Sequence, residues 1–145
     1  MSDDIVAAFR AHLRGDRQEW NRLNEALDRS PATTEPYFAF LTALFAMAVQ
    51  RRFGNAPTDD EIIDFVADLR SREDVLADRL SADATERMIT MIVRDDVMTD
   101  DIPRQQTIDI RMGVLTAIIR DEAPDATEIE DLLKGSRALA DGLLS

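Results

Sequence analysis

The sequence contains no cysteine and only one histidine, His12. Without cysteine the chain can form neither a disulfide, nor a thiolate nucleophile, nor a cysteine zinc site. With one histidine it cannot assemble a site from several histidine ligands. Its five glycines are scattered along 145 residues, so no glycine-rich loop for a nucleotide phosphate can be built. We therefore expect no cofactor, and the usual catalytic motifs are missing.

Positive charge is also scarce. The chain has 17 lysines and arginines against 29 aspartates and glutamates, which gives a formal net charge of −12. A protein that binds nucleic acid through a broad surface needs a basic patch to neutralise phosphates. The acidic balance therefore argues against direct nucleic-acid binding.

Long hydrophobic runs are absent as well. The longest apolar stretch covers residues 38–49 and is interrupted by Thr42. A membrane-spanning helix needs about 18 or more apolar residues, so this stretch predicts a core helix and no membrane span. The chain starts Met1-Ser2-Asp3-Asp4, without the basic and apolar segments of a secretory signal. We expect a soluble, cytoplasmic protein.

The sequence is instead rich in helical periodicity. Apolar residues recur at three- and four-residue spacing along most of the chain, and turn pairs of the kind found in hairpins are missing. The prediction is an all-α fold, with residues 1–145 forming a single domain of six or seven helices. A helix over about 36–53 is apolar on every face, which predicts a buried central helix around which the others pack.

Helix boundaries can be predicted from capping residues. Gly15 is typical of a helix end, and Asp16 followed by Glu19 is typical of a helix start. Thr58 with Glu61 has the same capping pattern, and Thr127 with Glu130 predicts the start of the last helix. Ser30-Pro31 predicts the end of the second helix, and Thr33 or Thr34 the cap of the third, with Pro36 in its first turn.

Two groups of polar residues could carry chemistry. Asp60, Asp64 and Asp68 lie one turn apart on one face of a predicted helix over 59–72, and paired carboxylates can bind a divalent cation. The alternative is a solvated helix face, because acidic residues near a helix start also complement its dipole. His12 could serve as a general base, but without partner residues at a suitable spacing it is more typical of a residue near a helix end.

Two further groups could contact a partner. Arg10, Arg14 and Arg17 concentrate positive charge near the N-terminus, where they could bind a phosphate or an acidic partner, or pair within the chain. Met88 and Met91 lie one helical turn apart. Methionine-rich surfaces adapt to peptide partners, although methionine more often fills gaps in a core.

The leading functional hypothesis is a non-enzymatic helical module that binds a protein partner or regulates one. A homodimer is included, because the apolar stripes over 88–93 and 115–119 could pair between two copies. A second hypothesis is a metal-assisted enzyme or cation site that uses the three aspartates. A third is an acidic decoy for a basic, nucleic-acid-binding partner, because residues 73–145 hold eight basic and seventeen acidic residues.

Overall fold

A computed structural model of the protein describes residues 2–54, 56–94 and 99–144. All regular structure within these ranges is α-helical, which confirms the predicted all-α class. The helices are α1 (Asp3–Leu13), α2 (Arg17–Ala26), α3 (Pro31–Phe53), α4 (Asp59–Ser71), α5 (Asp74–Arg79), α6 (Ala82–Arg94), α7 (Arg104–Glu122) and α8 (Ala126–Leu144). These eight helices exceed the expected six or seven, and the short α5 ends where the backbone becomes extended at Leu80.

Contacts within the chain group into two compact units. Unit 1 comprises residues 1–47 and 119–145, and unit 2 comprises residues 48–118. The unit boundaries fall within α3 and α7, so each of these helices contributes residues to both units. The two units are described separately below, and the expectation of a single domain stays a prediction.

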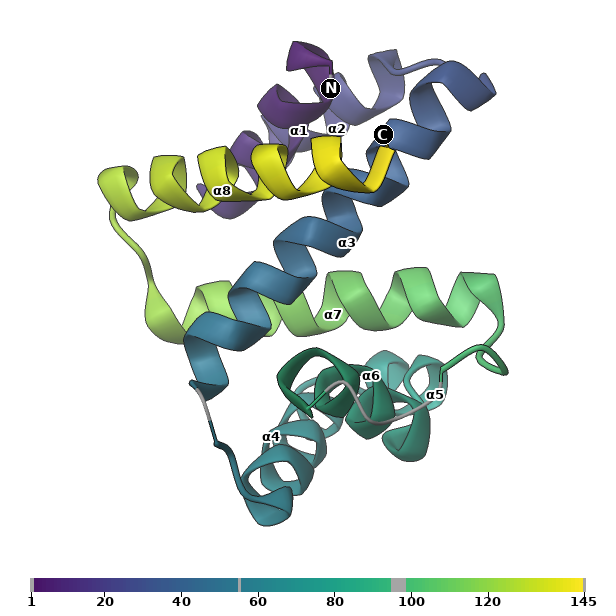
Figure 1. Ribbon diagram of the computed structural model, residues 1–145, viewed down its shortest axis with the longest axis vertical. Coiled ribbons are helices and arrows are strands. Elements are labelled where there is room, and N and C mark those ends of the chain that lie inside the picture. Colours follow the sequence, from purple (N-terminus) through teal and green to yellow (C-terminus); the bar gives the residue numbers. More distant parts are fainter. Residues whose placement is uncertain (1, 55, 95–98, 145) are drawn as a thin grey trace. The chain divides into compact units, whose positions relative to one another are not determined.

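In unit 1, α1 packs against both α2 and α8 (Figure 1). The apolar face of α1 contributes Ile5 and Phe9 to the core, and α8 contributes Ile129 and Leu133. At Gly135 an added Cβ would lie 2.5 Å from the Cε atom of Met47, so a side chain at this position would require the flexible end of Met47 to move.

An aromatic cluster ties α1, α2 and α3 together within unit 1. The Phe9 ring is fully buried and lies between 5.1 and 5.4 Å, centroid to centroid, from the rings of Trp20, Tyr37 and Phe40. The Tyr37 hydroxyl donates a 3.0 Å hydrogen bond to the Asn24 Oδ1 atom. Burial raises the pKa of Tyr37 to about 12, so the hydroxyl keeps the proton that this bond needs.

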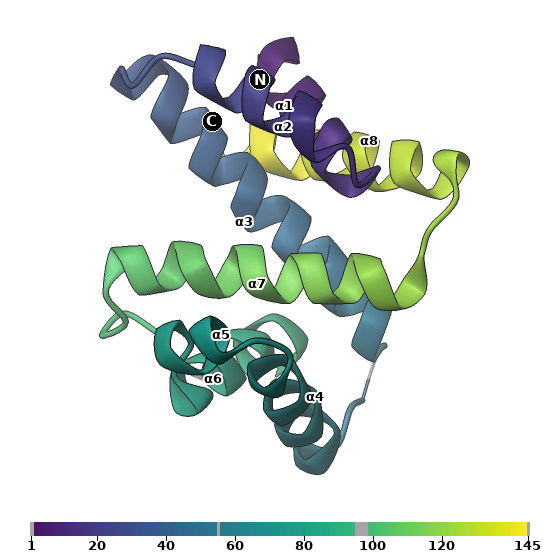
Figure 2. The same ribbon diagram turned by 180° about the vertical axis from the view of Figure 1, so that it is seen from behind.

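Unit 2 contains α4, α5 and α6, and both α5 and α6 contact α4 (Figure 2). The Arg70 guanidinium, on α4, donates hydrogen bonds to the carbonyls of Ala77 and Leu80, at 3.2 and 2.8 Å, and so holds the end of α5. Arg94, at the end of α6, pairs with Asp59 and donates to the Pro57 carbonyl at the start of α4. These two arginines fix the ends of three helices.

Gly113 provides a close contact inside unit 2. A Cβ atom at this position would lie 3.1 Å from a methyl carbon of Leu80. A glycine within a strong helix marks either close packing or a bend, and at Gly113 it allows close packing against Leu80.

The start of α3 differs from its prediction. The helix begins at Pro31, because the Ser30 carbonyl accepts hydrogen bonds from the amides of Thr33 and Thr34. Proline suits the first position of a helix, which needs no N–H. Ser30-Pro31 therefore starts α3, whereas it was predicted to end the preceding helix, and Pro36 lies inside α3.

The prediction that this helix is buried on all faces is only partly right. Phe40, Leu44 and Phe45 are buried, but Phe38 and Ala46 are partly exposed. Among the described helices, α3 alone is long and apolar enough to cross a membrane, and 39% of its most apolar 18-residue window is buried. Core helices of soluble proteins pass the same test, so this finding is compatible with a soluble protein.

Two of the predicted caps are confirmed, whereas the one predicted for the last helix is wrong, like that of α3. The amide of Glu19 donates to Asp16, and that of Glu61 donates to Thr58, as expected. The last helix, however, is capped by Asp125, whose carboxylate accepts from the Glu128 amide at 2.8 Å. The Glu128 carboxylate accepts from the Asp125 amide in return, at 3.2 Å, which completes a reciprocal capping box two residues before the predicted one.

Candidate interaction surface

The last two turns of α8 expose three leucines. The exposed fractions of Leu139, Leu143 and Leu144 are 42%, 56% and 42%. Leu139 and Leu143 are one turn apart. Ser136 is fully buried and lies seven residues before Leu143, on the same side of the helix. The apolar stripe of α8 thus continues beyond its buried residues into a part of the helix that is exposed to solvent. We call these three leucines the α8 leucine patch.

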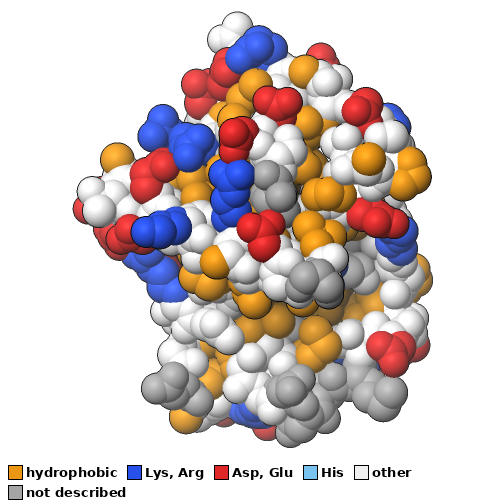
Figure 3. All heavy atoms as spheres, turned by 45° about the horizontal axis from the view of Figure 1, so that its top comes forward, with side chains coloured by type: hydrophobic (Ala, Val, Ile, Leu, Met, Phe, Trp, Pro, Cys, Tyr) orange, Lys and Arg blue, Asp and Glu red, His pale blue; other side chains and the backbone are white. Residues whose placement is uncertain are grey.

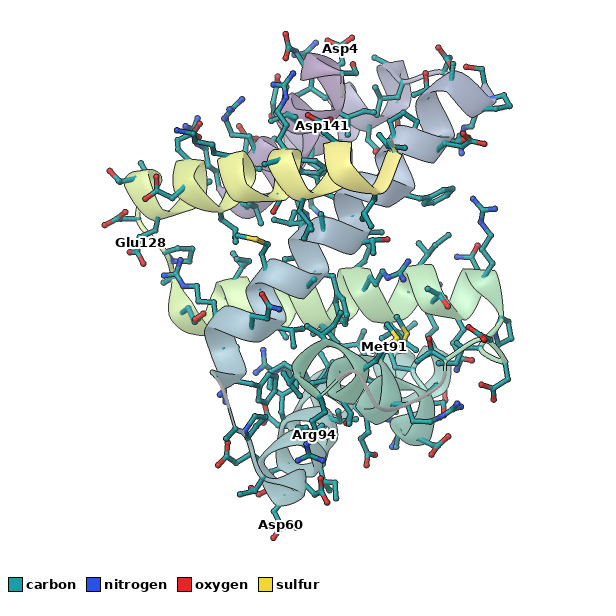
Figure 4. The ribbon with its side chains drawn as sticks, viewed as in Figure 1. Asp4, Asp60, Met91, Arg94, Glu128 and Asp141 are labelled. Atoms are coloured by element: carbon teal, nitrogen blue, oxygen red, sulfur yellow. The ribbon has the colours of Figure 1, made fainter. Side chains whose placement is uncertain are left out.

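Charged side chains of both signs lie on the second half of α8, which carries this patch. Arg137 of α8 forms a 2.8 Å ion pair with Asp3, which brings the start of α1 beside the second half of α8. Figure 4 shows Asp4, from α1, and Asp141, from α8, toward the same end of unit 1. On the face shown in Figure 3, acidic and basic side chains are interspersed with exposed hydrophobic ones. The surroundings of the patch therefore include negative charge.

The predicted arginine patch is largely used within the chain. Arg10 forms two hydrogen bonds of 2.9 Å to the two carboxylate oxygens of Glu130, and Arg14 reaches the same carboxylate at 3.4 Å. The Arg10 guanidinium also holds the pKa of Glu130 below its usual value. Arg17 is exposed on α2. The structure thus favours pairing within the chain over a free site for a phosphate, at least for Arg10 and Arg14.

The two predicted interaction methionines fall in different environments. Met88 is 1% exposed and belongs to the core of unit 2, so it is not available to a partner. Met91 is partly exposed, and its sulfur accepts a 3.3 Å hydrogen bond from the Thr99 hydroxyl. Leu115 and Ile118 are buried too. The stripes proposed to form a homodimer are thus largely covered within the chain itself.

The three aspartates of α4 are exposed, as Figure 4 shows for Asp60. Asp68 is paired with Arg72 at 2.8 Å. Across the described ranges, no group of three or more histidine, aspartate or glutamate side chains is placed to hold a metal ion. The geometry therefore favours the solvated helix face over the predicted metal site at Asp60, Asp64 and Asp68.

Negative charge is shared between the two units. Unit 1 holds 14 acidic and 8 basic residues, and unit 2 holds 15 acidic and 9 basic residues, so each has a net charge of −6. The acidic excess after residue 72 does not correspond to one unit, because residues 73–118 belong to unit 2 and residues 119–145 belong to unit 1. The acidic excess that suggested a decoy is therefore not concentrated in either of the two units.

His12 lies in the last turn of α1, against the aromatic cluster. Its ring centroid is 4.8 Å from that of Trp20. Burial, and to a smaller extent the positive charge of Arg120, lowers the pKa of His12 below its ordinary value of 6.5. A neutral, largely buried imidazole contributes mainly to packing.

Because the pKa of His12 is lower in the folded than in the unfolded chain, the unfolded chain binds more protons as the pH falls below 6.5. We therefore expect the free energy of unfolding to decrease between pH 7.5 and pH 5.5, and His12→Gln to make this decrease smaller. Urea titrations of both proteins across this range measure the difference. Parallel curves for the two proteins would show that His12 has the same pKa in both states.

Arg111, in the middle of α7, was not among the predicted site residues. It is half-buried, and its Nε atom is inaccessible and has no hydrogen-bond partner within the described structure. A sequence signal existed, because Arg111 lies on the same helix side as Leu115 and Ile118, four and seven residues later. An arginine within an apolar stripe is a departure from the helical pattern.

The chain was compared with protein-family models, with curated proteins and with solved structures, and none of the three comparisons found a match.

Proposed function

We propose that the protein is a non-enzymatic, cytoplasmic helical module that binds a protein partner through the α8 leucine patch. The observation that carries this proposal is the exposure of Leu139, Leu143 and Leu144 at the end of an otherwise covered apolar stripe. Contiguous exposed apolar side chains are typical of protein contact sites, whereas isolated ones are common on any surface.

Charge suggests the chemistry of the partner. Unit 1 has a net charge of −6, and Asp4 and Asp141 lie toward the end of the unit that carries the patch. Two copies of such a surface would repel each other, whereas a partner with arginines or lysines around an apolar centre would be attracted. The proposed partner is therefore a basic protein with an apolar contact, and a second copy is the less favourable occupant.

The test compares three baits in capture from native lysate: wild-type protein, Leu139→Asp/Leu143→Asp, and Ile63→Asp. Ile63 is a matched control, because it is 45% exposed but lies on α4 in unit 2. We expect a basic protein to be captured by the wild type and by Ile63→Asp and to be lost with the double variant. With the purified partner, the double variant should bind at least about 30-fold more weakly, the effect of losing an interface hot spot.

Salt dependence and self-association complete the test. Affinity for the partner should fall as ionic strength rises, since exposed charges are screened. Identical captured proteins for all three baits, or a partner of acidic character, would contradict the proposal. Sedimentation equilibrium that shows a wild-type dimer and a monomeric double variant would instead assign the patch to a second copy.

A further inference from the structure

Helix α2 is held in unit 1 without a buried side chain of its own. None of its ten residues is buried, whereas α1, α3 and α8 all contribute buried side chains to the core. Its apolar residues Trp20 and Leu23 are both partly exposed. The ion pair of Arg22 with Glu19 lies within α2 and does not attach it to a neighbour. Movement of α2 away from the unit would therefore expose little of its own surface to water.

Two side chains attach α2 to the helices beside it. The centroid of the Trp20 ring lies 5.4 Å from that of Phe9 and 4.8 Å from that of His12, both on α1. Asn24, one turn later on the same side of α2, accepts the 3.0 Å hydrogen bond from the Tyr37 hydroxyl of α3. Because both attachments lie on one side of a single helix, they are lost together when α2 moves away.

The helical backbone is interrupted at both ends of α2. Gly15 precedes the helix with a φ of +76°, a conformation that favours glycine, and Leu27 follows it in an extended conformation. Isolated helices shorter than about 12–15 residues are marginal in water, so the ten residues of α2 depend on their attachments to stay helical. A weakly attached segment between two such interruptions can open while its neighbours stay folded.

We propose that α2 is a detachable cover of the aromatic cluster, which leaves α1 and α3 as one unit while the rest of unit 1 stays folded. The open form is a minor population in which the Phe9 and Tyr37 rings lose their contacts with Trp20 and Asn24. The Phe9 side chain, fully buried in the closed form, then becomes accessible. This conformational change does not depend on the α8 leucine patch, which lies on another helix.

Hydrogen exchange of the full chain at low urea concentrations, followed by mass spectrometry, measures the opening. Relative to an unfolded chain, the amides of residues 20–26 should exchange at least about 10-fold faster than those of residues 40–47 in α3. Their exchange should depend little on urea, because the opening exposes a small surface. Equal protection of the two segments, with the same urea dependence, would overturn the proposal, because α2 would then open only when the core unfolds.

Ile129→Val separates local opening from unfolding of the core. Ile129 is a buried residue of α8, and the loss of one methyl group there should speed exchange of residues 40–47 by about 2- to 12-fold. Residues 20–26 should keep their wild-type exchange rate, because their opening leaves the environment of Ile129 intact. A matching acceleration in residues 20–26 would contradict local opening.

Asn24→Ala tests the attachment itself, with Asn21→Ala as the matched control. Both variants replace an asparagine of α2 by alanine and change helix propensity alike, but Asn21 is exposed, whereas Asn24 bonds to Tyr37. Residues 20–26 should exchange about 2- to 12-fold faster in Asn24→Ala than in Asn21→Ala, the effect of one lost hydrogen bond. Tyr37→Phe, which keeps the ring, should give a similar acceleration over the wild type. Equal rates in the two alanine variants, or no acceleration in Tyr37→Phe, would overturn the proposed attachment of the cover.

Discussion

Phe9→Ala is expected to lower the free energy of unfolding by about 3–5 kcal/mol, the usual cost of removing a buried phenylalanine ring. The Phe9 side chain is fully buried and contacts aromatic rings from two other helices, Trp20 on α2 and Tyr37 and Phe40 on α3. The alanine variant would leave a cavity that these rings cannot fill without moving. Since small proteins are stable by only about 5–15 kcal/mol, this one change would remove a large share of the total.

Urea unfolding followed by Trp20 fluorescence measures the effect directly, because the chain contains one tryptophan and its ring centroid is 5.4 Å from that of Phe9. Phe38→Ala is the matched control. Phe38 lies on α3, is partly exposed and contacts the Tyr37 ring at its edge. It should cost less than half as much as Phe9→Ala. Equal losses for the two variants would show that the cluster does not centre on Phe9.

The cluster also explains how α2 is held. None of the residues of α2 is buried, so this helix depends on partial contacts at one side. Trp20 reaches Phe9 and His12 on α1, and Asn24 accepts the hydrogen bond of Tyr37. Loss of the Phe9 ring therefore weakens the attachment of α2 as well as the core beneath it.

Local features of the fold could be predicted from the sequence. The helical class follows from periodicity, and the caps at Asp16 and Thr58 follow from side chains that bond to an amide three residues later. The start of α3 could not be predicted reliably, because Ser30 precedes Pro31 and Thr33 and Thr34 lie shortly before Pro36, and each of these residues can cap a helix. Only the backbone hydrogen bonds of the folded chain show that the helix begins at Pro31.

The candidate site was harder to predict, because periodicity identifies an apolar face but not what covers it. Met88 and Leu143 both belong to apolar stripes, yet Met88 is 1% exposed and Leu143 is 56% exposed. The pairing of Arg10 with Glu130 joins residues 120 positions apart, a separation at which sequence spacing carries no information. Arg111 could have been recognised from its helix side, but its lack of a partner is visible only in three dimensions.

Phe65→Ala, in unit 2, is expected to cost about 3–4 kcal/mol of unfolding free energy. Phe65 is 6% exposed, and its ring meets the Phe53 ring edge-on, with centroids 5.3 Å apart. The Arg52 guanidinium lies over both rings, 5.1 Å from the Phe53 centroid and 5.6 Å from that of Phe65. The variant thus loses apolar burial, an aromatic pair and a cation–π contact at once.

Two milder variants separate these contributions. Phe65→Leu keeps most of the buried volume and should cost about 1–1.5 kcal/mol. Ile63→Ala, at an exposed position of the same helix, should cost less than about 1 kcal/mol. If Phe65→Ala were as mild as Ile63→Ala, the Phe53–Phe65 contact would not contribute to stability as the geometry requires.

Phe65→Ala also tests the prediction of a single domain. Trp20 fluorescence reports only on unit 1, whereas far-ultraviolet circular dichroism reports on all eight described helices. A single cooperative domain unfolds in one transition, so different probes give the same midpoint. We expect Phe65→Ala to shift the Trp20 fluorescence midpoint and the dichroism midpoint together, although the substitution lies in the other unit. A fluorescence midpoint that stays at the wild-type value while the dichroism signal splits into two steps would show that the two units unfold independently.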